Sequence, residues 1–176
     1  ISDNELPSIA CPSNITGTND LGLCAMVATF TTPLGTDNCP SATTIQPTGL
    51  VSGSAFPVGT TTNTFRVTDA AGNTATCSFT VMVTDSELPT ITCPSNVNSS
   101  NDPGLCSSVV NYTTPVGLDN CAGPLTTFTS GLAPGATFPI GITTNSFLVV
   151  DAAGNSATCA FTVTINDTEL PIITCP

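Results

Sequence analysis

The chain has 176 residues, with 12 acidic side chains against one Arg and no Lys or His, so its formal net charge is −11. This balance argues against nucleic-acid binding, which needs Lys and Arg to neutralise phosphates. Without His or Lys, the Ser–His and Ser–Lys pairs of nucleophilic enzymes are excluded. No apolar run approaches the ~20 residues of a membrane helix, so we expect no membrane span in this segment.

The sequence repeats with a period of 82 residues, because Asp69 returns as Asp151 within the shared motif DAAGN. The cysteines keep this spacing without a gap: Cys11, Cys24, Cys39 and Cys77 return as Cys93, Cys106, Cys121 and Cys159, and Cys11 returns again as Cys175. The period is too long for a helical solenoid and suits a tandem array of small domains. We predict a first module over 1–82, a second over 83–164, and the first strand of a third over 165–176.

Alternation of apolar and polar residues predicts β-strands, and no stretch shows a sustained helical period. In chain order, strands are expected near 7–11, 14–18, 24–31, 42–47, 50–57, 60–68 and 74–84, and again 82 residues later. The last is the clearest: apolar residues occupy alternate positions from Ala75 to Val83, with Thr, Ser and Met between them.

Turn motifs such as NDLG, TPLGTDN and DAAGN separate these strands. Short strands with regular turns predict an all-β fold of tandem immunoglobulin-like antiparallel β-sandwiches, disulfide-stapled and arranged end to end. The expected aromatic core consists of Phe30, Phe56, Phe65 and Phe79, with Tyr112, Phe138, Phe147 and Phe161 as their counterparts.

Five motifs together resemble the hyalin repeat (HYR) family: ITCPSN, GLC, DNC, FPVGTTT and TDAAGNTATCSFTV. The resemblance covers the whole chain. It implies an immunoglobulin-like fold, an extracellular or cell-surface location and a role in adhesion or matrix. It implies no enzymatic activity and no catalytic residues.

Domains of about 80 residues bury a marginal core, so covalent staples are expected. The nine cysteines include no CxxC pair and there is no His, which favours disulfides in an oxidising compartment over a zinc site. The loops of an immunoglobulin-like sandwich favour the pairs Cys39–Cys77 and Cys121–Cys159, with Cys11–Cys77 as the alternative.

Two hypotheses remain for Cys24. Pairing within each module gives Cys11–Cys24 and Cys93–Cys106. Pairing across the junction gives Cys24–Cys93 and Cys106–Cys175, and Cys11 would then pair with a preceding module.

Acidic residues recur at matching positions of the linkers and loops: Asp3, Glu5, Asp37 and Asp69, then Asp85, Glu87, Asp119 and Asp151. We expect these groups to meet at one pole of each module. No cofactor is required, but oxygens converging at a junction without Lys or Arg would suit Ca²⁺, which takes six to eight oxygen ligands. The alternative is that these side chains cap tight turns by accepting backbone hydrogen bonds.

Sequons for N-linked glycosylation occur at Asn14, Asn98, Asn111 and Asn166. With no Trp and one Tyr, the chain offers no evident sugar-stacking cleft for a pair of catalytic carboxylates, so we expect no enzyme.

The expected function is that of a structural repeat segment of a long extracellular fibre, filament or cell-surface adhesin, in which stapled modules act as a stiff spacer. Its expected partners are further repeats or neighbouring copies of itself, and a cell-surface or glycan ligand. The alternative is an adhesin array that presents a receptor-, carbohydrate- or ice-binding face, recognisable by an exposed aromatic cluster or a flat Thr ladder. In a third hypothesis, segment 166–176 completes a neighbour's fold by strand addition.

Overall fold

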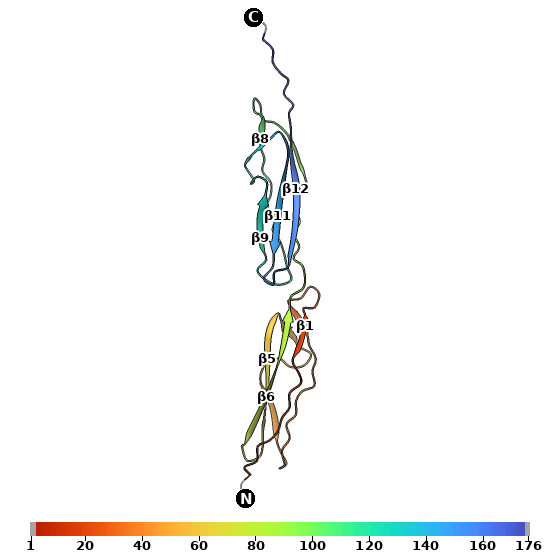
Figure 1. Ribbon diagram of the computed structural model, residues 1–176, viewed down its shortest axis with the longest axis vertical. Helices are drawn as coiled ribbons and strands as arrows, with labels where there is room; N and C mark the ends of the chain where they lie inside the picture. Colours follow the sequence, from red (N-terminus) through yellow and green to blue (C-terminus); the bar gives the residue numbers. More distant parts are fainter. Residues whose placement is uncertain (1–2, 175–176) are drawn as a thin grey trace. The chain divides into compact units, whose positions relative to one another are not determined.

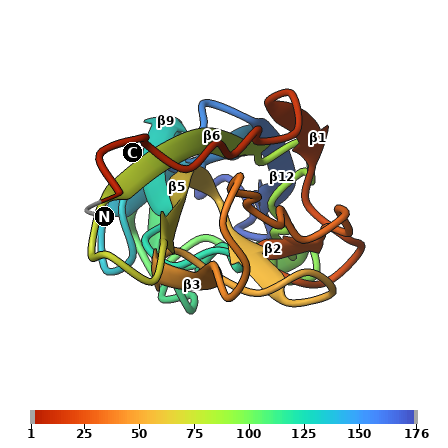
Figure 2. The same ribbon diagram turned by 90° about the horizontal axis from the view of Figure 1, so that it is seen from below.

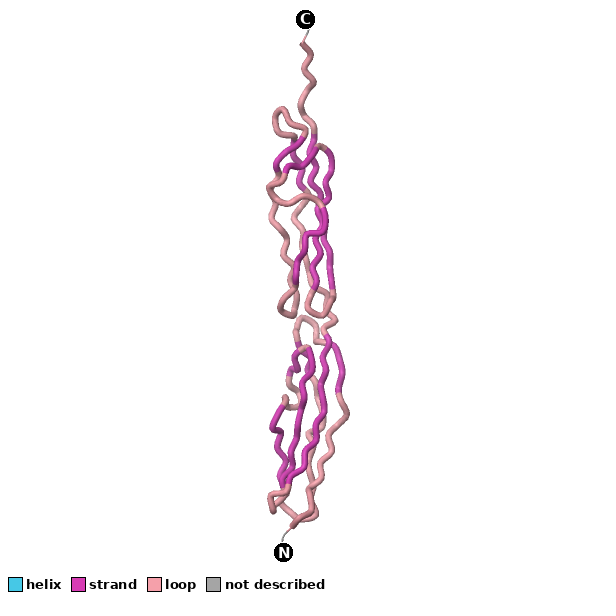
Figure 3. The backbone as a smooth tube through the Cα atoms, turned by 60° about the vertical axis from the view of Figure 1, so that its left-hand side comes forward, coloured by secondary structure: helices cyan, strands magenta, loops and turns pink. Residues whose placement is uncertain are grey.

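The computed structural model describes residues 3–174, and these are strands, turns and loops (Figure 3). The chain divides into two compact units, with the boundary between Glu87 and Leu88. The first unit contains β1 (Ile15–Thr18), β2 (Ala25–Val27), β3 (Thr43–Thr48), β4 (Ala55–Pro57), β5 (Gly59–Thr68) and β6 (Thr74–Thr84). The second contains β7 (Val97–Ser100), β8 (Ser107–Val109), β9 (Leu125–Ser130), β10 (Thr137–Pro139), β11 (Gly141–Val150) and β12 (Ser156–Asn166).

Each unit is an immunoglobulin-like sandwich of a four-stranded and a two-stranded sheet. In the first unit the order β1-β6-β5-β3 packs against β2-β4, and in the second β7-β12-β11-β9 packs against β10-β8. Figure 1 shows β5 and β6 as long neighbouring strands, and Figure 2 shows β2 on the opposite side of the first unit. The β5–β6 hairpin is paired without interruption from Gly59↔Val83 to Thr68↔Thr74, so it is the longest regular ladder of the first unit.

One strand pair in each unit is parallel, which the antiparallel prediction missed. β1 pairs with β6 in the register Ile15↔Val81, and β7 pairs with β12 in the same way. The first strand of the module enters at one pole and the last strand leaves at the other. Both strands therefore run in the same direction when they lie side by side.

Three predicted strands are shorter than expected. The segment 7–11 makes a single bridge, Ser8↔Thr36, while 24–31 contracts to β2 and 50–57 contracts to β4. Beyond β2, the side chain of Ser52 takes the place of a partner strand, since its Oγ accepts from the amide of Phe30 at 2.8 Å and donates to its carbonyl at 2.7 Å. The alternation of residues predicts an extended chain, but it does not show where a side chain, rather than a neighbouring strand, hydrogen-bonds the backbone.

The aromatic core lies where it was predicted. Phe56, Phe65 and Phe79 are buried in the first unit, and their counterparts Phe138, Phe147 and Phe161 are buried in the second. Phe30 and Tyr112 are half-buried and pack on these cores edge-on. The Tyr112 hydroxyl donates to the Leu132 carbonyl at 2.7 Å, so its polar end is satisfied.

A buried amide lies within each core and was not predicted. Asn63 is fully buried, and its Oδ1 accepts from the amide of Leu50 at 2.8 Å and from Gln46 at 3.2 Å. Asn145 binds the amide of Leu132 in the same way at 2.7 Å. The signal was present in the alternation, because Asn63 shares the inward phase of Phe65.

Candidate functional site: the entry pole of each module

Three segments form the entry pole of the first module, which we define as residues 3–8, 36–40 and 69–73. Asn73 joins the first and third of these segments, since its Nδ2 donates to the carbonyls of Asp3 and Glu5, both at 3.2 Å, and to Asp69 Oδ2 at 2.8 Å. Two backbone hydrogen bonds of 2.8 Å tie Ser8 to Thr36. The DAAGN motif therefore fastens the entering chain to the β5–β6 hairpin.

Asp69 is a turn cap. Its Oδ1 accepts from the amides of Ala71 at 2.9 Å and Asn73 at 2.8 Å. Burial raises the pKa of this carboxyl, but the hydrogen bonds from Asn73 and from the backbone of the loop together lower the pKa by more than burial raises it. The net shift is therefore downward. Asp151 has the same arrangement with Asn155, and its pKa is also lowered.

Because the pKa values of Asp69 and Asp151 are lowered in the folded protein, the free energy of unfolding should fall at acidic pH. A carboxyl whose folded pKa is depressed stabilises the fold above its unfolded pKa of about 3.9 and loses that contribution as the pH falls through the lower folded value. We expect the urea midpoint to fall as the pH drops below about 4, and the Asp69→Asn, Asp151→Asn double variant to be less stable at neutral pH and less sensitive to acid. Asp167→Asn, which replaces an exposed acid, is the control. Equal acid sensitivity of the double variant and the parent would contradict this role.

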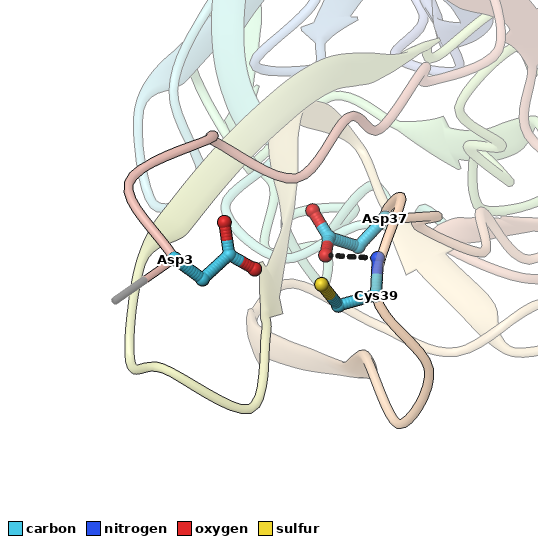
Figure 4. Close-up of side chains that lie close together, drawn as sticks. All are labelled: Asp3, Asp37 and Cys39. Carbon is cyan, nitrogen blue, oxygen red and sulfur yellow. Dashed lines mark hydrogen bonds between the residues drawn. The ribbon is translucent and has the colours of Figure 1, made fainter. Parts of the chain in front are cut away.

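Asp3, Asp37 and Cys39 come closest to a metal-binding group at this pole, with potential ligand atoms within 4.8 Å of one another (Figure 4). Asp37 Oδ2 accepts from the Cys39 amide at 2.9 Å, and Asp37 Oδ1 is buried with no hydrogen-bond partner among the described residues. A hydrogen bond to Asp3, then burial and the charges of Asp3, Asp37 and Asp69, raise the pKa of the Cys39 thiol. The neighbouring carboxylates therefore favour the thiol over the thiolate.

This donor set fits Ca²⁺ poorly. Calcium takes six to eight hard oxygen ligands, whereas the group offers two carboxylates and a sulfur. The other acids that were expected to bind it have partners: Glu5 Oε2 accepts from Asn38 at 2.7 Å, and Asp69 binds its own loop. Calcium stays a prediction, and the hydrogen bonds favour the turn-capping alternative.

Two of the corresponding acids of the second repeat, Asp85 and Asp119, accept hydrogen bonds from nearby backbone amides. Asp85 accepts from the Glu87 amide at 3.1 Å, and Asp119 accepts from the Cys121 amide at 2.8 Å. Glu87 Oε2 accepts from the Gly22 amide at 2.7 Å, so this linker acid holds the loop that precedes β2. Glu169 binds the amide of Gly104 in the same way at 2.7 Å.

The structure pairs Cys11 with Cys77 and Cys93 with Cys159, with Cα atoms 5.5 and 5.6 Å apart. The alternative pairing Cys11–Cys77 is thus confirmed. The predictions that these bonds overturn are Cys39–Cys77, Cys121–Cys159, Cys11–Cys24, Cys93–Cys106 and Cys24–Cys93.

The parallel register explains the pairing. Ile15 lies opposite Val81, and four residues earlier along both segments, before β1 begins, Cys11 is bonded to Cys77. Cys39 and Cys106 are free thiols, whereas Cys24 and Cys121 are disulfide-bonded. The predicted partner of Cys106, Cys175, lies outside the described residues.

The four sequon side chains Asn14, Asn98, Asn111 and Asn166 are exposed, as a glycan acceptor must be. The Oδ1 of Asn14 accepts from the Thr80 amide at 2.9 Å, which holds the side chain against β6. Glycosylation stays a prediction.

Comparison with known families decides the identity. The family model described as the HYR domain matches residues 2–83 and 84–165. The chain belongs to the HYR domain family. The HYR chain is 37% identical over 181 residues to hyalin of Strongylocentrotus purpuratus, covering 99% of this chain and 15% of that protein. It is 33% identical to hyalin of Lytechinus variegatus, covering 98% of this chain and 33% of that protein. The HYR chain therefore spans a third or less of the length of these relatives.

Solved cadherin structures are also similar. A protocadherin gammaB7 structure of domains EC3–6 matches with a TM-score of 0.40 and 12% identity, over 94% of the HYR chain and 52% of that chain. Protocadherin gammaB4 matches with a TM-score of 0.42 and 11% identity, over 93% and 34% respectively.

HYR modules are extracellular repeat domains of the adhesion type, and the disulfides of this chain fit an extracellular or cell-surface location. Among the described residues, no helix is long and apolar enough to cross a membrane.

Proposed function

We propose that this HYR segment is a stiff, tension-bearing spacer in an extracellular fibre, filament or cell-surface adhesin. The observation that carries the proposal is the position of the disulfide Cys11–Cys77. It joins the entering segment of the module to β6, the strand by which the chain leaves, and it encloses a sequence separation of 66 residues.

A force applied to the two ends of a module passes along the entering segment, through the disulfide and out along β6. The residues between Cys11 and Cys77 then lie outside the path of the force and cannot be extended. Once the disulfide is reduced, the parallel pairing of β1 with β6 becomes the clamp, because the force then passes from β1 to β6 and loads their hydrogen bonds together in shear. The module should therefore resist extension even after its core has melted.

Single-molecule stretching tests this function. In the oxidised protein, unfolding of a module should release only the short segments outside the disulfide. With reductant, each module should release an additional length of about 230 Å, since 66 residues extend by up to ~3.5 Å each. The Cys11→Ala, Cys77→Ala variant should show that length in the first module without reductant. Equal extension with and without reductant would contradict the load-bearing role.

The outer face of the long hairpin argues against an ice-binding or other regular ligand face. In the first module this face presents the cross-strand pairs Thr62↔Thr80 and Thr64↔Ser78. At the equivalent positions of the second module the pairs are Thr144↔Thr162 and Ser146↔Ala160, so the row of hydroxyls is interrupted. We therefore do not propose an ice-binding or other regular ligand face on this hairpin.

A further inference from the structure

The two modules share a fold but differ at one edge of their four-stranded sheets. β3 is the last strand of that sheet in the first unit, and β9 is the last strand in the second. Figure 1 shows β9 beside β11, and within residues 3–174 β9 makes its backbone hydrogen bonds with β11 alone. The outer row of amides and carbonyls of β9 is therefore open to a further strand.

The first module protects the corresponding edge. Pro47, which has no amide hydrogen, interrupts β3. Arg66, the one basic side chain of the chain, is exposed on β5 opposite Ile45 of β3. Proline and charged side chains are two devices by which natural sheets keep other strands from pairing with an edge. β3 is therefore a poor template for an added strand.

The second module has neither device. Thr129 occupies the position of Pro47 and Leu148 the position of Arg66, each 82 residues later. Thr129 keeps its amide hydrogen, and its hydroxyl donates to the Ser146 carbonyl at 3.0 Å. The sequence of β9 is Leu-Thr-Thr-Phe-Thr-Ser, which contains strand-forming residues and no Pro or charge. β9 is thus an unprotected edge strand.

The side chains of β9 are also more apolar than those of β3. Leu125 and Phe128 are 68% and 42% exposed, and at these positions the first module has Thr43 and Gln46. Thr127 is the exception, because its counterpart in β3 is apolar. An added strand would cover both exposed side chains, so the hydrophobic effect favours its binding together with the backbone hydrogen bonds.

The apolar surface continues from this edge onto the sheet. A groove of about 430 Å³ beside β9 is lined in part by Thr129, Leu148 and Ala160. The first module has Ser78 at the position of Ala160. The second module therefore lacks polar groups both along the edge and on the adjoining sheet.

The distribution of charge indicates which strand fits this edge. Residues 120–150 contain no charged side chain, whereas the chain as a whole carries 12 acids and a net charge of −11. A basic partner would be attracted to the acidic loops rather than to this neutral strand. Two copies of the chain repel each other over most of their surface, but not where both are uncharged. The strand that fits β9 is neutral, partly apolar and free of Pro, as β9 itself is.

We propose that β9 pairs antiparallel with β9 of a second copy of the chain, so that two four-stranded sheets join edge to edge across a two-fold axis. The same residues of both copies form the contact. Because β3 is protected, the assembly closes at two copies. This inference goes beyond the spacer function, since lateral pairing of segments is separate from their resistance to force.

Sedimentation velocity of the whole chain tests the pairing, after its free thiols have been alkylated. The chain should be monomeric at low concentration and dimeric at high concentration. Added NaCl should strengthen the dimer, because salt screens the repulsion between the two anionic copies. Hydrogen exchange followed by mass spectrometry should show slower exchange of the Leu125–Ser130 amides in the dimer than in the monomer.

Three results would overturn the proposal. A chain that stays monomeric at every concentration has no such contact. A dimer that dissociates at high salt is held by ion pairs, which this edge cannot supply. Protection of the β9 amides in the monomer would mean that a segment of the same chain covers the edge.

The first module supplies the substitutions that test the location of the contact. Thr129→Pro and Leu148→Arg introduce its protective residues, and each should weaken the dimer by about tenfold or more. Thr62→Arg, which adds the same charge at an exposed position of the first module, is the control and should leave the dimer intact. The reciprocal variant Pro47→Thr, Arg66→Leu should open the first edge and give species larger than dimers.

Circular dichroism should show that these variants stay folded, and Leu148→Arg keeps the test valid if Thr129→Pro does not fold. A dimer that Leu148→Arg leaves unchanged lies elsewhere on the molecule, which would overturn the proposal. Single-molecule stretching does not involve the free edge of β9. Failure of this pairing is therefore distinguishable from failure of the spacer function.

Discussion

Replacing Cys11 and Cys77 together with Ala should lower the free energy of unfolding of the first module by about 4 kcal/mol, because the disulfide closes a loop of 66 residues in the unfolded chain. A small module with one modest core has little stability in reserve, so a loss of this size should unfold much of the population at 37 °C. Denaturant unfolding followed by circular dichroism measures the change as a new transition at low denaturant.

Two comparisons make the result specific. The Cys93→Ala, Cys159→Ala variant should destabilise the second module by a similar amount, because its disulfide has the same sequence separation of 66. Cys39→Ser removes a thiol that is in no disulfide and should change stability by less than about 1 kcal/mol. If Cys39→Ser were as damaging as loss of the disulfide, the stabilisation would not come from closure of the loop.

Phe147→Ala should destabilise the second module by about 3–5 kcal/mol. The Phe147 ring is 1% exposed, stacks on Phe161 with centroids 6.5 Å apart and meets the Tyr112 ring edge-on at the same distance. Removing it leaves a cavity that the long, regular strands around it cannot close. The urea midpoint of the second module measures the effect, while the transition of the first module should not move.

Phe128→Ala is the matched control within the same module. Phe128 contacts Phe147 at 5.2 Å between centroids but is 42% exposed, so its removal opens no enclosed cavity. We expect a loss of no more than about 1.5 kcal/mol. Equal losses for the two variants would mean that β9, rather than the hairpin, organises the core.

The role of the acids changes how the entry pole is understood. In the sequence, carboxylates with no neighbouring Lys or Arg are compatible with an ion site and also with caps of tight turns. The structure favours the second explanation, since Asp69 and Glu5 accept hydrogen bonds from groups of their own module. The pole is therefore held by hydrogen bonds between segments that lie far apart in the sequence.

Several features of this chain follow from the sequence by itself. The 82-residue period, the inward face of β6 and the buried aromatics could all be predicted, because each depends on spacing along one segment. Side chains of a strand alternate between two faces whatever the strand pairs with. Asn63 lies on the inward face of β5 together with Phe65 and Val67. The alternation therefore placed Asn63 in the interior, but its burial was not predicted because the other residues of that face are apolar.

The cysteine pairing was decided only by the tertiary structure. Cys77 had two candidate partners, and the choice depended on which strand lies beside β6 and in which direction it runs. The parallel register of β1 against β6 places Cys11 opposite Cys77, and Cys39 stays in the entry-pole loop. Strand direction and register are properties of pairing between segments 66 residues apart. The alternation of residues along one strand does not depend on which strand pairs with it or in which direction. The fold class and the core could therefore be predicted from the sequence, whereas the disulfide pairing of the module could not.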